Sequence, residues 1–137
     1  MKTCTKCGQV KELSEFSKNR HNKSGFNYRC KACERERIMQ WKVENPDKQR
    51  DSRLRRNYGI SLDAYDQLLQ EQGGVCAICG TDNPGSNTRF MVDHNHDTGE
   101  VRGLLCGNCN RGIGLLGDNI STLSKAITYL SDNGSYG

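Results

Sequence analysis

The chain has 137 residues, of which 34% are hydrophobic and 26% charged, and its formal net charge at pH 7 is +4. This length suits one ordinary domain or two very small ones. No apolar run resembles a signal peptide or is long enough to cross a membrane, which argues against a secreted or membrane-embedded protein and predicts an intracellular one with no membrane partner.

Residues 1–33 are predicted to form a small zinc module. Apolar side chains are sparse in this part of the chain, and a unit so poor in them usually needs a disulfide or a metal as a staple. Two CxxC pairs, Cys4/Cys7 and Cys30/Cys33, flank a polar insert. Each CxxC turn places two sulfurs on one side, so that two turns complete a tetrahedral zinc site. Reduced intracellular thiols favour zinc over disulfides; the alternative is a thiol redox protein without zinc.

Residues 34–60, ERERIMQWKVENPDKQRDSRLRRNYGI, are predicted to form a basic helical linker with a break at Asn45-Pro46. Apolar positions are too few for a wide buried stripe, and we expect Trp41 to dock against another part of the protein. The basic side chains here are candidate phosphate contacts, with a purely solvated connector as the alternative. They are Arg35, Arg37, Lys42, Lys48, Arg50, Arg53, Arg55 and Arg56, and Lys31 of the preceding module is a further candidate.

The positive charge is concentrated in the first part of the chain. Residues 1–60 hold 16 of the 20 Lys and Arg but only 7 of the 16 Asp and Glu, a net charge of +9, and residues 61–137 carry −5. This asymmetry predicts a polyanionic partner for the N-terminal part. The alternative is that the basic residues only keep the chain in solution.

Residues 61–137 are predicted to form the third unit. Ser61 is a candidate N-cap for a helix that ends near Gly73-Gly74. After the Cys76/Cys79 turn, the runs Arg89–Val92 and Val101–Leu105 flank a turn signal and predict a β-hairpin.

The Cys106/Cys109 turn should open a helix that runs to about Leu116, followed by a last helix from about Asn119 to Leu130 and a frayed tail, residues 131–137. The last helix places apolar residues along one side, which predicts core positions. These residues are Ile120, Leu123, Ile127 and Leu130.

The segment VDHNHD, residues 92–97, is the chemically richest stretch of the hairpin. Cys76, Cys79, Cys106 and Cys109 satisfy a second zinc ion completely, which leaves the His and Asp side chains without a role at that metal. A mixed site that used His94 with some of the cysteines would leave the other thiols without a metal. Asp97 precedes Thr98-Gly99 and is more typical of a turn residue.

Asp93 and His94 are adjacent on a predicted strand and so should point to opposite sides of a group lodged between them. In-line displacement at phosphorus needs a base with its water on one side and a cation beside the leaving oxygen on the other. Mg²⁺ prefers oxygen ligands and keeps several waters. Asn110, which follows the last zinc cysteine at the start of a helix, offers a second oxygen ligand beside Asp93.

The runs GVCAICG and VDHNHDTGEVRGLLCGNCN, within Gly74 to Gly117, resemble the phage recombination endonuclease VII family, a branch of the HNH or ββα-metal (His-Me finger) nucleases. The resemblance implies a small, zinc-stapled α+β fold: a ββα-metal nuclease core over residues 61–137, joined to the N-terminal Cys4 module by the linker helix. It also implies a phage- or prophage-encoded protein in the bacterial cytoplasm.

By this resemblance, Asp93 and Asn110 would bind Mg²⁺ or Mn²⁺, and His94 would activate the water that attacks a DNA phosphodiester. His96 matches a second histidine of the family motif, and its role is open between phosphate contact and support. Arg102, within the matching VRGLLC run, and Arg111 are candidate phosphate contacts. The alternative function is a non-catalytic zinc-finger DNA-binding protein.

The sequence also departs from the pattern of the junction-resolving relatives. They carry a further histidine where this chain has Met91, and an acidic residue where it has Ile113. Their long C-terminal dimerisation region has no counterpart here, and the N-terminal CxxC module is extra. The prediction is therefore a DNA endonuclease that nicks or cuts duplex DNA, with branched-DNA specificity and oligomeric state left open.

Overall fold

The computed structural model describes residues 1–133, and the chain divides into two compact units, residues 1–50 and the chain from Asp51 onward. The division lies within helix α2, Pro46–Tyr58, and thus inside the predicted linker of residues 34–60. None of the helices of the described residues is long and apolar enough to span a membrane.

The N-terminal unit is organised around cysteines rather than around a large apolar core. Strands β1, Lys2–Thr3, and β2, Val10–Lys11, form a short antiparallel pair that is followed by the 3-10 helix η1, Leu13–Glu15, and by α1, Lys31–Glu44. The buried cluster consists of three thiols and one aromatic ring, with a second ring packed against it. These residues are Cys4, Cys30, Cys33, Phe16 and Phe26. A core this small agrees with the expected need for a metal staple.

The predicted helix break is confirmed at Asn45-Pro46. Helix α1 ends at Glu44, and Pro46 is the first residue of α2, a position at which proline's missing N–H is not needed. Asn45 closes α1, because its Nδ2 donates to the carbonyl oxygen of Trp41 at 3.0 Å. The indole of Trp41 is not docked: the residue is 42% exposed. Cys33 is the only buried residue of α1, and the expectation of a docked Trp41 was wrong.

The second unit has a conventional apolar core. Helix α3, Leu62–Glu71, begins at the predicted cap, where Ser61 Oγ accepts a hydrogen bond from the Ala64 N–H at 3.0 Å. Tyr65 of α3 is buried, and its hydroxyl donates to the carbonyl oxygen of Phe90 at 2.8 Å. The core joins α2, α3, the hairpin and two zinc-site cysteines. Its buried members are Leu54, Tyr65, Cys76, Phe90, Val92, Leu104, Leu105 and Cys106.

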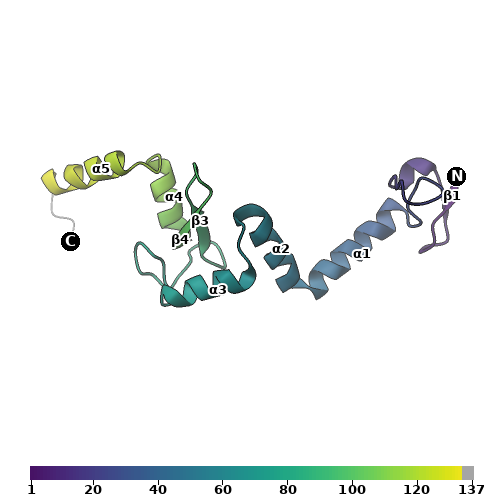
Figure 1. Cartoon of the computed structure of the whole chain (residues 1–137), viewed down its shortest axis with the longest axis horizontal. Helices are drawn as coiled ribbons and strands as arrows, with labels where there is room; N and C mark the ends of the chain where they lie inside the picture. Colours follow the sequence, from purple (N-terminus) through teal and green to yellow (C-terminus); the bar gives the residue numbers. More distant parts are fainter. Residues whose placement is uncertain (134–137) are drawn as a thin grey trace. The chain divides into compact units, whose positions relative to one another are not determined.

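Strands β3, Met91–His94, and β4, Val101–Leu105, form the predicted antiparallel hairpin, and helix α4, Gly107–Leu115, follows directly (Figure 1). Strand β3 extends two residues beyond the expected end at Val92, because Asp93 and His94 belong to the ladder. The register shifts between them: Asp93 pairs with Gly103 and His94 with Val101. Arg102 therefore has no partner across the hairpin, which makes it the extra residue of a β-bulge.

A glutamine side chain lies along the outer edge of β4. Gln72 Nε2 donates to the carbonyl oxygens of Leu104 and Val75 at 3.0 Å each, and the Leu104 N–H donates to Gln72 Oε1 at 2.8 Å. A Cβ at Gly103 would approach Gln72 Oε1 to 3.2 Å, so the close approach of the amide favours glycine there. This side chain joins the end of α3 to the hairpin.

Helix α5, Ile120–Asp132, corrects a further expectation. Ile120, Ile127 and Leu130 are 83%, 67% and 51% exposed, and only Leu123 is partly covered. The apolar periodicity correctly predicted a helix with one apolar face, but it contains no information on what that face contacts. Of the tail expected to fray, Ser131 and Asp132 are helical, and residues 134–137 lie outside the described residues.

Candidate functional site

The second unit contains one four-cysteine cluster, Cys76, Cys79, Cys106 and Cys109, whose sulfurs all lie within 4.8 Å of one another. Cys106 caps the N-terminus of α4, where its Sγ accepts from the Cys109 N–H at 3.4 Å. Burial opposes ionisation of Cys76, but N–H groups of Cys106, Cys79 and Ile78 overcome it and lower the pKa of its thiol to about 6. Four close sulfurs with amide support are the geometry of a closed structural zinc site.

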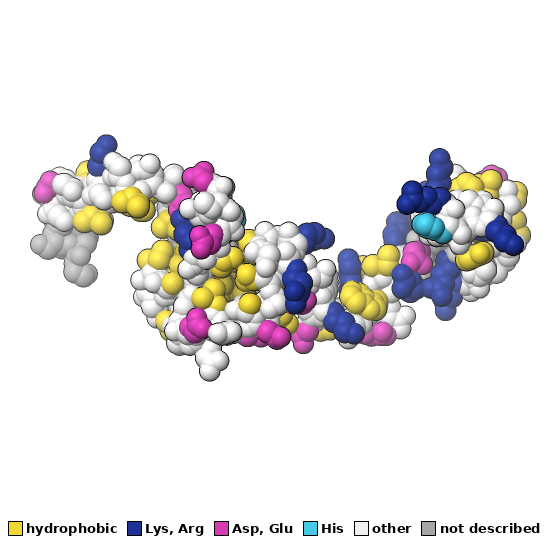
Figure 2. All heavy atoms as spheres, in the orientation of Figure 1, with side chains coloured by type: hydrophobic (Ala, Val, Ile, Leu, Met, Phe, Trp, Pro, Cys, Tyr) yellow, Lys and Arg dark blue, Asp and Glu magenta, His cyan; other side chains and the backbone are white. Residues whose placement is uncertain are grey.

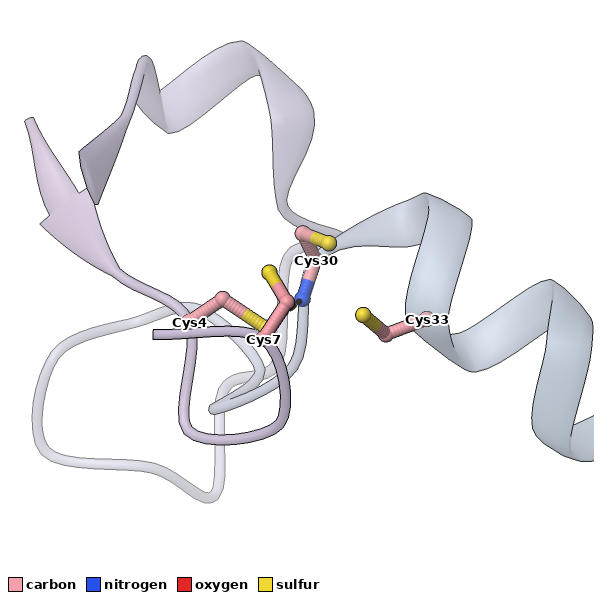
Figure 3. Close-up of side chains that lie close together, drawn as sticks. All are labelled: Cys4, Cys7, Cys30 and Cys33. Carbon is pink, nitrogen blue, oxygen red and sulfur yellow. Dashed lines mark hydrogen bonds between the residues drawn. The ribbon is translucent and has the colours of Figure 1, made fainter. Parts of the chain in front are cut away.

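The N-terminal unit repeats this arrangement with Cys4, Cys7, Cys30 and Cys33, whose side chains converge from two turns, Cys33 from the start of α1 (Figure 3). Backbone N–H groups of Cys7 and Cys30 lower the pKa of the Cys4 thiol to about 6. A hydrogen bond with Cys30 raises that of Cys33 to about 12. Both clusters found among residues 1–133 consist of cysteines alone. His94 belongs to neither, so the structure gives no support to a mixed zinc site.

A cavity of about 250 Å³ lies where β3, β4 and α4 meet. Asp93, His94, His96 and Asn110, the four residues predicted to be catalytic, all line it. Asp93 is buried, whereas His94 and Asn110 are half-buried and His96 is exposed. Asn110 and the three hairpin residues, 14 to 17 positions apart in the sequence, are thus brought to one cavity by the hairpin and by the helix that follows Cys106.

The imidazole of His94 is held between two other rings. Its centroid lies 5.6 Å from that of Tyr58 and 4.8 Å from that of His96, with interplanar angles of 57° and 53°. Tilted contacts of this kind are favourable for aromatic rings and limit the rotation of His94. Tyr58 and His96 therefore orient the histidine at the wall of the cavity.

Asp93 is paired with an arginine. Arg102 donates from Nε to Asp93 Oδ2 at 2.8 Å and from Nη2 to Oδ1 at 3.0 Å. The same guanidinium donates from Nη1 and Nη2 to the carboxylate of Asp118, at 3.0 and 2.9 Å. These contacts raise the pKa of Arg102 above its ordinary value, and the hydrogen bonds from Arg102 lower that of Asp118. Arg102, expected to contact phosphate, thus lies between two carboxylates.

Asn110 reaches the cavity from the first turn of α4, immediately after Cys109. Its Nδ2 approaches Met91 Sδ at 3.6 Å, a weak acceptor. The amide oxygen of Asn110 has no hydrogen-bond donor among the contacts of the described residues. This oxygen is therefore available to a ligand in the cavity.

The predicted phosphate contacts fall into four groups. Arg37 and Arg55 pair with Glu34 and Asp51 on their own helices. Arg111 is exposed on α4 and does not line the cavity. Arg50 is half-buried, and the others, Lys31, Arg35, Lys42, Lys48, Arg53 and Arg56, are exposed without an ion pair among residues 1–133. Figure 2 shows Lys and Arg side chains gathered over the N-terminal unit, which holds 13 Lys and Arg against 6 Asp and Glu, a net charge of +7.

Two residues that line the cavity and contact its predicted polar side chains were not predicted from the sequence. Tyr58 stood at the end of a segment interpreted as a basic linker, and Asp118 lay in an apparently ordinary loop between two helices. The signal for Asp118 was its place in the run GLLGDN, an acidic residue directly after a glycine that ends a helix. Both residues reach the cavity only through the tertiary fold.

Comparison with known proteins gives three findings. Residues 51–132 match the model of a family described as recombination endonuclease VII. Gene 59 proteins of Mycobacterium phages L5 and D29 are each 46% identical over 81 residues, 58% of this chain and 49% and 48% of theirs, so the match spans about half the length of these curated relatives. A solved structure, that of the β-β-α-Me type II restriction endonuclease Hpy99I, is 26% identical with a TM-score of 0.40, over 96% of this chain and 65% of that one.

Proposed function

Because the chain belongs to the recombination endonuclease VII family, we propose that it is a metal-dependent DNA endonuclease that hydrolyses phosphodiester bonds, with His94 as the general base. The observation that carries this proposal is that His94, Asp93 and Asn110 line one and the same cavity. An imidazole, a carboxylate and an amide oxygen at one cavity are the parts that such a reaction needs.

The donor set of the cavity fits a hard divalent cation. Asp93 offers carboxylate oxygens and Asn110 an amide oxygen, the ligand types that Mg²⁺ and Mn²⁺ prefer, and Mg²⁺ usually keeps several waters besides one or two protein ligands. Each Asp93 oxygen accepts one bond from Arg102, and a carboxylate oxygen can accept a second partner. The chemistry that a bound cation supplies is neutralisation of the phosphate and of the leaving oxygen.

In the proposed reaction, His94 accepts a proton from a water molecule as that water's oxygen forms a bond to phosphorus. The bond between phosphorus and the leaving sugar oxygen breaks at the same time, and the leaving oxygen takes a proton from solvent. The contacts of His94 with Tyr58 and His96 hold the imidazole in place for this transfer, because proton transfer requires the base within hydrogen-bonding reach of the water. His96 supports His94 in this proposal.

The zinc ions would have no part in the chemistry. The cluster of Cys76, Cys79, Cys106 and Cys109 begins α4 and lies against the core of the hairpin, so a zinc ion there would fix Asn110 relative to Asp93. A closed four-thiolate site leaves no position for a substrate. Zinc is thus proposed as scaffold, and Mg²⁺ or Mn²⁺ as the catalytic ion.

Replacing Asp93 by alanine is expected to lower plasmid cleavage by about 10²–10³-fold, since the charge stabilisation from a catalytic metal amounts to several kcal/mol. DNA affinity should stay unchanged or rise, because a negative charge is removed. Cleavage of supercoiled plasmid in Mg²⁺ or Mn²⁺ and binding to a short duplex measure the two effects. The control is Asp97→Asn in the exposed hairpin turn, which should cleave normally.

The same pair of measurements tests the alternative of a non-catalytic zinc-finger protein, which the two cysteine clusters and the cationic unit favour. Under that alternative, the wild-type protein binds DNA and leaves it intact in every divalent ion. Cleavage that Asp93→Ala removes without loss of affinity excludes it. A cleavage series on linear, nicked, single-stranded and branched DNA would then define the preferred substrate.

For the N-terminal unit we propose electrostatic, sequence-independent binding to DNA phosphates. Its net charge of +7 and its exposed Lys31 and Arg35 support this role. Each phosphate neutralised by a cationic side chain releases counterions, so that log affinity falls linearly with log salt concentration by roughly 0.9 per contact.

Arg35→Gln should reduce the salt slope by about 1 and weaken binding to duplexes of different sequence equally. Arg37→Gln is the matched comparison on the same helix. Its guanidinium is already paired with Glu34, so its loss should have the smaller effect. Fluorescence anisotropy between about 50 and 200 mM salt provides the slopes. Affinity indifferent to salt would contradict the proposed binding mode.

A further inference from the structure

Arg102 makes four hydrogen bonds, two to each of the carboxylates of Asp93 and Asp118. We propose that Asp118 is a positioning residue for the cation site: it shares Arg102 with Asp93, and so keeps Asp93 able to bind a divalent cation. This inference rests on the proposed function of Asp93 as a cation ligand. Asp118 acts through Arg102 and contacts neither the cation nor the substrate.

The effect of Asp118 on cation binding follows from a competition for the Asp93 carboxylate. Arg102 and a divalent cation both bind Asp93, and a bidentate guanidinium–carboxylate pair is among the stronger hydrogen-bonded pairs in proteins. Asp93 is buried, so its pairing is poorly screened by water. With Asp118 present, part of the donor capacity of Arg102 is directed away from Asp93.

The charges of the three side chains support the same conclusion. Asp93, Asp118 and Arg102 together carry a net charge of −1, which attracts a dication. Without Asp118 the remaining pair is neutral. Both the competition and the net charge therefore predict that loss of Asp118 weakens cation binding. The charge effect does not need Arg102, whereas the competition does, so only the competition predicts that the loss disappears when Arg102 is removed.

The turn at the end of helix α4 determines where the Asp118 carboxylate lies. Helix α4 ends in a Schellman motif, in which the Asp118 N–H donates to the Ile113 carbonyl at 2.9 Å and the Gly117 N–H to that of Gly114 at 3.0 Å. Gly117 has a φ of +76°, and Asp118 follows with a φ of +53°, the one non-glycine residue of positive φ in the described part of the chain. Two successive left-handed residues return the chain to the hairpin.

Asparagine is the informative substitution for Asp118. Asn and Asp both tolerate the left-handed conformation, so Asp118→Asn keeps the turn and the side-chain size and removes the charge. On the hairpin, Arg102 occupies the bulge, where a side chain can be redirected without disturbing the ladder. Arg102→Gln likewise keeps a polar chain and removes the cation.

The test is a double-mutant cycle of Mn²⁺ affinity, measured without DNA on the zinc-loaded full chain by the electron paramagnetic resonance signal of free Mn²⁺. Asp118→Asn should lower Mn²⁺ affinity by roughly 10–100-fold, the effect typical of outer-shell partners at metal sites. Arg102→Gln should raise it, because a competing cation is lost. In the Arg102→Gln background, Asp118→Asn should change the affinity by less than about twofold, the scatter of independent sites.

Three outcomes would overturn the inference. The first is an equal loss in both backgrounds, which would mean that Asp118 acts on the cation without Arg102. The second is no loss in either background, and the third is an equal loss with Asp66→Asn, an exposed residue of α3 that changes the net charge alike. Asp93→Ala separates this inference from the proposed function. If it binds Mn²⁺ as the wild type does, the assignment of Asp93 fails; if it loses Mn²⁺, that assignment stands whatever Asp118 does. Zinc content and thermal unfolding confirm that each variant is folded.

Discussion

Replacing His94 by alanine is expected to slow cleavage of supercoiled plasmid by about 10²–10⁴-fold, the usual effect of losing a general base. The imidazole lines the cavity beside Asp93 and Asn110, and no other side chain there is both a suitable base and held in place by two rings. DNA and Mn²⁺ affinity should be unaffected, because His94 is proposed to ligate neither. The rates are measured under single-turnover conditions in Mg²⁺ and in Mn²⁺.

His21→Ala is the matched control, since it removes an exposed histidine of the N-terminal unit. It should cleave at the wild-type rate. Equal nicking by wild type and His94→Ala would contradict the assignment of the base. His96→Ala adds a graded test: as a supporting residue it should cost less than His94→Ala.

Loss of the second zinc site is expected to unfold residues 51–133 altogether. Apparent binding energies for structural zinc are about 10–16 kcal/mol in zinc-finger peptides, which is as large as the whole stability of a typical domain, about 5–15 kcal/mol. Cys76 and Cys106 are themselves buried members of the apolar core. A zinc ion at this cluster would therefore hold together the centre of the unit rather than its surface.

Cys106→Ser should reduce the zinc content from two to one per chain, remove the cooperative unfolding transition of the second unit, and abolish cleavage. Asn108→Ser lies between Cys106 and Cys109 and is exposed, so it should keep both zinc ions. Elemental analysis and circular dichroism measure these effects. A zinc-free wild-type chain that reacts rapidly with thiol reagents would instead indicate a thiol redox protein.

The features that could be predicted from the sequence are those with local causes. Pro46 cannot continue a helix, Ser61 can cap one, and cysteines at CxxC spacing can bind one metal; the structure shows each of these features. The shared cavity of Asp93, His94 and Asn110 was also predictable, because the cysteines fix the helix beside the hairpin. These inferences need only a few neighbouring residues.

Non-local packing explains what could not be predicted. The bulge at Arg102 depends on how two strands pair, and its bonds to Asp118 join residues 16 positions apart. The apolar residues of α5 show the converse: periodicity identified a face correctly, but burial requires a partner surface, and Ile120 and Ile127 remain exposed. Trp41 was misjudged for the same reason.

The contact of Gln72 with Leu104 has a consequence for self-association. A two-stranded hairpin exposes unpaired N–H and C=O groups at its margins, and such margins are templates for intermolecular strand addition and aggregation. The Gln72 amide occupies both backbone groups of Leu104, much as a third strand would. The Ala77 N–H also donates to the Leu104 carbonyl oxygen at 3.1 Å. An incoming strand would have to displace both the Gln72 side chain and this backbone contact, which together protect the margin of the hairpin.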